Sequence, residues 1–229
     1  VMDSLFDQGT VLEMQPAFAP NLVTAFARLG GISVGIIANQ PQHLAGCLDV
    51  NASDKASRFV RFCDAFNIPL ITLVDVPGFL PGADQEHGGI IRHGAKMLWS
   101  YSEATVPKLT LIMRKDYGGS YLAMCARQQG ADFSFAWPTA EIAVMGAEGA
   151  VEILFASEIK GSKDPQATRQ EKLDEYREAF YSPYRAAERS YIDGVVLPSQ
   201  SRAVLYQALV AMSNKREVRP PRKHGNTPL

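Results

Sequence analysis

The sequence predicts an α/β fold built around a mainly parallel sheet. Short apolar runs rich in β-branched residues alternate with segments of helical periodicity along most of the chain. Strand–helix–strand units of this kind make right-handed crossovers, which place successive strands side by side and parallel. The composition, with 46% apolar and 21% charged residues in 229, is that of a globular protein. Because no low-complexity linker divides the chain, we expect residues 1–229 to form one domain.

The first strand–helix–strand unit is predicted over residues 32–74. Residues 32–38 form a β-branched run bounded by Gly30-Gly31 and by Asn39-Gln40-Pro41, which indicates a buried strand. Ser53 is the expected N-cap of the following helix, which Asn67 and Pro69 end. Residues 70–74 are the second strand. The apolar positions with helical spacing between them are Ala56, Phe59, Val60, Cys63 and Phe66.

The same alternation continues toward the C-terminus. Residues 85–104 are predicted to be a helix with Ile91, Ala95 and Leu98 on one face. A third strand is expected at 107–113, followed by a helix at 120–129. Further expected elements are short strands at 133–136 and 141–144, a mostly helical region at 148–209 with a loop at 161–165, and a short extended piece at 192–196.

Two glycine-rich turns follow consecutive strands and are the candidate site. One is Gly78-Phe79-Leu80-Pro81-Gly82 and the other Tyr117-Gly118-Gly119-Ser120. Ligands of parallel sheets bind at the carboxyl ends of the strands. The glycines allow close backbone approach, and the free N–H groups of the next helix suit an oxyanion. The N–H groups of Phe79 and Ser120 are therefore expected to form a two-donor pocket; ordinary turns without a ligand are the alternative.

Composition and motifs exclude several other function classes. The net charge of −1 argues against a general nucleic-acid-binding protein, and the short basic tail, 215–229, is expected to be a solvated or docking segment. Motifs of a hydrolase elbow, a nucleotide P-loop and a dinucleotide fingerprint are missing. The histidines His43, His87, His93 and His224 lie in no motif.

The cysteines and the apolar segments bear on the compartment. Cys47, Cys63 and Cys125 form no zinc or disulfide pattern, so we expect reduced thiols and no metal in this chain. No apolar run is long enough to span a membrane, and the acidic first residues do not resemble a secretory signal. We therefore expect a cytoplasmic protein, or a mitochondrial matrix protein if the source is eukaryotic.

Long motifs over nearly the whole chain resemble one known family. The resemblance is to the carboxyltransferase (β-type) subunit of biotin-dependent acyl-CoA carboxylases, such as those acting on propionyl-CoA and acetyl-CoA. The segments that carry it are residues 39–41, 44–46, 59–69, 75–82 (Asp-Val-Pro-Gly-Phe-Leu-Pro-Gly), 88–96 (Gly-Gly-Ile-Ile-Arg-His-Gly-Ala-Lys), 136–146 and 223–226.

The resemblance implies a fold, a reaction and partners. The fold is a crotonase-like (ClpP/crotonase) ββα superhelix, assembled as a homo-oligomeric trimer or hexamer. In the reaction, carboxybiotin on a separate biotin carboxyl carrier protein, served by a biotin carboxylase α subunit, releases its carboxyl group. The biotin enolate then takes the α-proton of an acyl-CoA, and the resulting carbanion captures CO₂. No protein side chain is needed as the base.

The resemblance also assigns site residues. Main-chain amides of Phe79, Gly119 and Ser120 are implied to be catalytic because they hold the biotin ureido oxygen. Leu122 is expected to line the acyl pocket. The implied biotin-binding residues are Gly78, Phe79, Gly118, Gly119 and Ser120.

The chain matches only the C-terminal half of the family's subunits. In the family, the N-terminal half supplies most of the CoA site and the oxyanion hole of the thioester. The active site lies between the first half of one subunit and the second half of a neighbour. The chain is therefore expected to be a shortened piece or one part of a split subunit, inactive without the N-terminal half.

The glycine turn departs from the carboxylase pattern and leaves the reaction direction open. Many acyl-CoA carboxylases have Ala at position 120 and Asp at position 122, where this chain has Ser120 and Leu122. The run 119–125 is more similar to transcarboxylase and acyl-CoA decarboxylase relatives, which perform the same half-reaction in either direction. Two other classes stay open: a CoA hydratase or isomerase using Glu148 or Asp84 as acid or base, and a non-catalytic assembly or docking domain.

Overall fold

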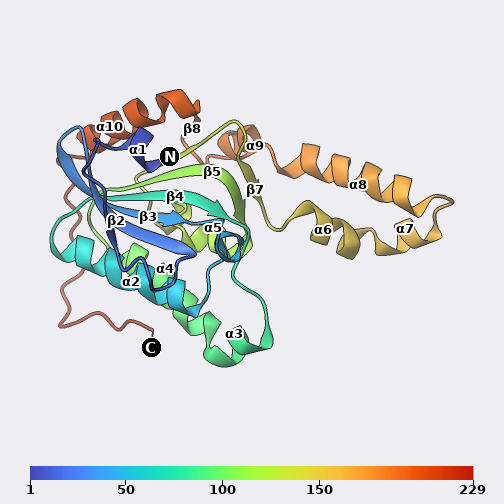
Figure 1. The fold of residues 1–229 in the computed structure, drawn as a ribbon, viewed down its shortest axis with the longest axis horizontal. Helices are drawn as coiled ribbons and strands as arrows, with labels where there is room; N and C mark the ends of the chain where they lie inside the picture. The colour runs from blue at the N-terminus through green and yellow to red at the C-terminus, as the bar shows by residue number, and fades with distance from the viewer. Residues whose placement is uncertain (229) are drawn as a thin grey trace.

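The computed structural model describes residues 1–228 and, within them, contains an eight-stranded sheet between layers of helices (Figure 1). Strands β1 to β3 pair antiparallel, and the sheet is parallel from β3 onward. The order is β1-β2-β3-β4-β5-β6-β8, with β7 also paired to β5. The strands are β1 (Leu12–Met14), β2 (Leu22–Leu29), β3 (Ile32–Asn39), β4 (Leu70–Val76), β5 (Lys108–Tyr117), β6 (Phe133–Ala136), β7 (Glu141–Ala143) and β8 (Gly194–Val195).

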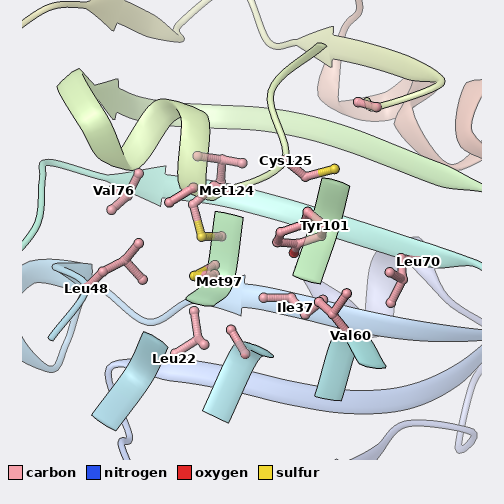
Figure 2. Packing of buried hydrophobic residues seen from close by; sticks show 14 of the residues in the cluster. Leu22, Ile37, Leu48, Val60, Leu70, Val76, Met97, Tyr101, Met124 and Cys125 are labelled. Atoms are coloured by element: carbon pink, nitrogen blue, oxygen red, sulfur yellow. The ribbon is translucent and has the colours of Figure 1, made fainter. Parts of the chain in front are cut away.

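Two helix layers bury the two faces of this sheet. Helices α2 (Val50–Ala65) and α4 (Ile90–Glu103) cover one face, and Figure 2 shows Leu22, Ile37, Val60, Met97 and Tyr101 packed between them and the strands. Helices α1 (Met2–Leu5) and α10 (Ser201–Ala211) cover the other face. No helix among residues 1–228 combines the length and apolarity that crossing a bilayer requires.

A helical arm projects from the body (Figure 1). It comprises α6 (Ala147–Leu154), α7 (Ala156–Gly161) and α8 (Pro165–Phe180), and α9 (Pro183–Glu188) returns the chain to the sheet. The arm has a small core of its own. At its base, the Tyr181 hydroxyl accepts a hydrogen bond of 2.5 Å from the Ala147 N–H and so caps α6. The expected loop at 161–165 is confirmed as the α7–α8 turn.

The first strand–helix–strand unit is confirmed, but its helix begins earlier than expected. Asp49, not Ser53, is the N-cap: its Oδ1 accepts from the Ala52 N–H at 2.8 Å. The same oxygen accepts from Asn21 Nδ2 at 3.1 Å. Ser53 lies one turn inside, fully buried, where its hydroxyl donates to the Asp49 carbonyl. The Asp49 carboxylate, which also binds Asn21, thus caps the helix in place of the Ser53 hydroxyl.

The predicted helix over 85–104 is two helices, and its apolar face is only partly buried, with Leu98 packed against the core. Gly89, at φ 87°, separates α3 (Ala83–Gly88) from α4. In α4 the buried positions are Ile90, Gly94, Met97, Ser100 and Tyr101, while Ile91 is 77% exposed. Gly94 lies in the middle of this buried face, where the Phe79 ring packs against it. Because glycine adds no apolar side chain to the pattern, hydrophobic periodicity does not reveal this face.

The predicted helix over 120–129 is also interrupted. Helix α5 spans only Gly118–Ala123, and a single 3₁₀ turn follows at Arg127–Gln129. Between them Cys125 adopts φ 62°, and its carbonyl accepts a 2.7 Å hydrogen bond from the Thr110 hydroxyl of β5. This tertiary bond holds the chain in a conformation that a continued helix would not permit.

The basic C-terminal tail pairs within the chain. Lys215 Nζ lies 2.9 Å from Asp132 Oδ2, and Arg222 forms an ion pair with Glu103 of α4. The Arg219 guanidinium donates to the Ser102 carbonyl. Residues 216–226 are nevertheless exposed, so the tail is largely solvated, in line with one of the two expectations.

Candidate active site

The two glycine-rich turns lie side by side, as their order along the chain predicts. Strands β4 and β5 are parallel neighbours, with Val76 opposite Asp116 at their carboxyl ends. The Phe79 ring lies between Gly119 of the glycine turn and Gly94 of α4. A methyl group on Gly119 would be 3.8 Å from two of its ring carbons, and one on Gly94 of α4 would be 3.0 Å away. The ring thus joins the first turn to the second.

The backbone of Phe79 is oriented by a single β-bridge to Leu48. The Leu48 N–H donates to the Gly78 carbonyl at 3.1 Å, and the Leu80 N–H donates to the Leu48 carbonyl at 2.8 Å. In a parallel bridge of this pattern, the middle residue's own N–H and C=O point to the opposite side. The Phe79 N–H is therefore directed away from Leu48.

The glycine turn needs its first glycine for steric reasons. Gly118 has φ 60°, and a Cβ there would lie 2.9 Å from the Val144 carbonyl oxygen. It opens α5, where the N–H groups of Gly118, Gly119 and Ser120 precede the first intrahelical donor. Gly119 is exposed, whereas Ser120 is fully buried at 0% and its hydroxyl donates to the Tyr117 carbonyl at 2.6 Å.

An apolar cavity of about 500 Å³ opens beside the glycine turn. Gly118, Gly119 and Leu122 form one wall, and Phe180 and Tyr191 contribute to the rest. Leu122 is 38% exposed. Ser120 and Phe79 do not line the cavity; Phe79 borders it through Gly119. Phe180 of α8 and Tyr191, which follows α9, were not predicted as site residues from the sequence, because they lie about 60 to 70 positions beyond the glycine turn.

A hydrogen-bonded frame holds the strand ends beneath both turns. Asn39 Oδ1 accepts from the Asp75 N–H at 3.1 Å, which ties the end of β3 to β4. The Asp75 carboxylate accepts from Arg114 Nε at 2.9 and 3.0 Å and from the Lys115 N–H at 3.3 Å. β3, β4 and β5 are thus connected where the turns begin. No local motif marks this frame in the sequence.

Tyr117, the residue before Gly118, contacts both β7 and the base of the arm. The Tyr117 hydroxyl donates to Glu141 Oε2 of β7, and the Tyr117 and Tyr181 rings stack with centroids 5.6 Å apart. Burial, and then the bond to Glu141, raise the pKa of Tyr117. Tyr117 therefore stays neutral and acts as a hydrogen-bond donor at physiological pH.

The acids considered for a hydratase or isomerase do not line the cavity. Glu148 pairs with Arg177 at 2.7 Å, and its pKa is lowered, chiefly by a backbone hydrogen bond. Asp84 lies exposed on α3. The buried acid next to the turn is Asp116, which the sequence reading overlooked. Among residues 1–228, no three His, Cys, Asp or Glu side chains are grouped to hold a metal.

The decisive comparison is with the family defined by the carboxyl transferase domain, whose model matches residues 1–227. The chain belongs to this family. This carboxyl transferase domain is 60% identical, over 228 residues, to the methylmalonyl-CoA carboxyltransferase 12S subunit of Propionibacterium freudenreichii subsp. shermanii. It is 58% identical over 229 residues to the methylmalonyl-CoA decarboxylase subunit alpha of Propionigenium modestum. Each alignment covers 100% of this chain and 44% of the relative.

Solved structures confirm the crotonase-like α/β fold class. The domain superposes on a transcarboxylase 12S crystal structure, with methylmalonyl-coenzyme A and methylmalonic acid bound, at a TM-score of 0.94 and 61% identity. That match covers 98% of this chain and 43% of the other. The β subunit of geranyl-CoA carboxylase from P. aeruginosa gives a TM-score of 0.81 at 29% identity, covering 98% and 42%. This domain thus spans less than half the length of its relatives.

Proposed function

We propose that this domain is the C-terminal half of a biotin-dependent carboxyltransferase. It would move a carboxyl group between carboxybiotin on a biotin carrier protein and a short acyl-CoA such as propionyl-CoA or acetyl-CoA. The observation that carries this proposal is the meeting of the Phe79 turn and the glycine turn beside an apolar cavity. Two similar relatives carry methylmalonyl-CoA in their names, which supports a short acyl group.

The residues at the turns suit a ligand oxygen that gains negative charge. Phe79, Gly119 and Ser120 would donate main-chain N–H groups to that oxygen, and Gly78 and Gly118 would let the ligand approach the backbone. When bound, carboxybiotin supplies the carboxyl group and the base for the α-proton of the acyl-CoA. A ligand that filled the apolar cavity beside the turn would displace water from it, which would strengthen these N–H contacts.

The proposal includes the rest of the assembly. An N-terminal carboxyltransferase half would complete the CoA site, and a biotin carboxyl carrier protein with its biotin carboxylase α subunit would deliver the carboxyl group. A homo-oligomer is supported by the hexamer assembly named for the transcarboxylase 12S structure. The free thiols of Cys47, Cys63 and Cys125 support a reducing compartment, the cytoplasm or the mitochondrial matrix.

The direction of the reaction has a second candidate. The chain is similar to both a carboxyltransferase and a decarboxylase subunit. A transcarboxylase or an acyl-CoA decarboxylase would use the same turns to run the half-reaction in reverse.

Carboxyl transfer in the complete subunit tests the function. With a carboxylated carrier protein, the complete subunit is expected to carboxylate propionyl-CoA, and avidin added to trap the biotin should abolish the reaction. The 229-residue chain alone is expected to be inactive. Turnover of propionyl-CoA by this chain alone would contradict the requirement for the other half. Hydration or α-proton exchange that avidin does not inhibit would favour a hydratase or isomerase instead.

Leu122 is expected to set the acyl preference. Its side chain lines the cavity two residues beyond Ser120 and offers only apolar contact. One methylene in such a pocket is worth about 1–3 kcal/mol in discrimination. Leu122→Asp in the complete subunit should therefore change the ratio of kcat/KM for propionyl-CoA and acetyl-CoA by about tenfold or more. An unchanged ratio, in a variant that folds, would place the acyl group elsewhere.

A further inference from the structure

Asp116 is a buried carboxyl group for which the proposed reaction has no use. It is 1% exposed and lies at the end of β5, directly before Tyr117-Gly118-Gly119. Its Oδ1 is the one fully buried side-chain oxygen or nitrogen of residues 1–228 that lacks a hydrogen-bond partner. Nearly all buried polar atoms in folded proteins have such partners, so this one requires an explanation.

The groups around Asp116 do not offer it a positive charge. Its neighbours across the sheet are Val76 of β4 and Ile142 of β7, both apolar. From α5 it faces Tyr121, whose pKa burial raises to about 12, with a smaller contribution from Asp116 itself.

The charged residues next to these neighbours are already engaged. Beside Val76, the Asp75 carboxylate is bound to Arg114 and to the Lys115 N–H. Beside Ile142, Glu141 is bound to the Tyr117 hydroxyl. Burial without a compensating cation raises the pKa of Asp116 well above its ordinary value. An ionised carboxylate here would be buried without a partner, which costs far more than a buried neutral acid.

We propose that Asp116 is a positioning residue that holds a proton beneath the glycine turn, so that the turn can stabilise negative charge on a ligand oxygen. Gly119 is three positions beyond Asp116 in the chain, which places their Cα atoms within about 11 Å of each other. A carboxylate at that distance in a medium of low polarity would oppose an oxyanion by on the order of tenfold in affinity. The neutral acid removes this repulsion. The identity of the ligand oxygen rests on the proposed function, whereas the proton on Asp116 does not.

The proton itself is tested by spectroscopy without any ligand. The infrared difference spectrum between the complete subunit and its Asp116→Asn variant at neutral pH should contain the carbonyl stretch of a protonated carboxyl group. Asp84→Asn, the same change at an exposed acid on α3, should show only carboxylate bands. Carboxylate bands alone in the Asp116 difference spectrum would overturn the proposal.

The effect on the turn is tested by the pH profile of carboxyl transfer. As pH rises and Asp116 loses its proton, the parent subunit should lose about tenfold in turnover. Asp116→Asn should match the parent to within about twofold at neutral pH and keep its turnover at alkaline pH, whereas Asp84→Asn should follow the parent profile. An alkaline decline that survives in Asp116→Asn, or a large loss at neutral pH, would refute the positioning role. If no subunit transfers carboxyl groups, the proposed function fails, and the infrared band still decides where the proton is.

Thermal stability gives an independent check with a defined sign. The folded pKa of Asp116 is raised, so its contribution to stability is fully present below the unfolded pKa of about 3.9 and is lost as pH rises toward the folded pKa. The Tm of Asp116→Asn minus that of the parent should therefore increase from about pH 5 to about pH 8. A difference that stays constant over this range would contradict a retained proton.

Discussion

Ser120→Pro is expected to lower turnover of the complete subunit by about 10²–10³-fold without preventing folding. Ser120 lies in the first turn of α5, where its N–H has no intrahelical acceptor, so the ring of proline removes no helix hydrogen bond. Gly119 before it tolerates the restriction that proline imposes on its neighbour. What the variant loses is one N–H donor for the ligand oxygen, a loss of roughly 3–4 kcal/mol.

Ser120→Ala is the matched control for this experiment. Both variants lose the 2.6 Å hydrogen bond from the Ser120 hydroxyl to the Tyr117 carbonyl. Only the proline variant also loses the backbone N–H, so the difference in turnover isolates that donor. Circular dichroism and steady-state turnover are the measurements. If a folded proline variant turns over like the alanine variant, Ser120 is not a donor, and the exposed Gly119 together with Phe79 must hold the oxygen.

Gly118→Ala is expected to reduce both stability and turnover. Gly118 has φ 60°, a conformation that costs a residue with a Cβ about 1–2 kcal/mol. The new Cβ would also lie 2.9 Å from the Val144 carbonyl oxygen, a backbone atom that cannot rotate away. The turn must therefore move relative to the cavity, which Val144 also lines. We expect a Tm lower by roughly 4 °C or more and a turnover at least about tenfold lower.

The adjacent glycine provides the comparison. A Cβ on Gly119 meets only the Phe79 ring, at an ordinary distance of 3.8 Å, and its φ is not in the left-handed region. Gly119→Ala should therefore leave Tm within about 1 °C of the parent. Equal Tm losses in the two variants would show that the whole turn, and not the conformation of Gly118, is intolerant of side chains.

Local sequence patterns were sufficient for the parallel part of the sheet and for the two turns. The β-branched runs at 32–38 and 70–74 correspond to β3 and β4, and the turns after β4 and β5 meet at the Phe79 ring. These features depend on the period of a few neighbouring residues and on the rule that parallel strands end at one edge. Strand β2 (Leu22–Leu29) was missed, although Gly30-Gly31, with φ 60° and 82°, is the tight turn that joins it to β3.

The sequence by itself determined the fold class, the order of its central elements and the place of the candidate site. Only the tertiary structure decided which face of α4 is buried, because Gly94 is selected there by the Phe79 ring and not by its own hydrophobicity. It also decided that Asp116 is buried without a partner, and that Phe180 and Tyr191 complete the cavity beside the turn. Burial and cavity walls arise from contacts between residues far apart in the chain. Periodicity and turn chemistry, which act between near neighbours, carry no record of those contacts.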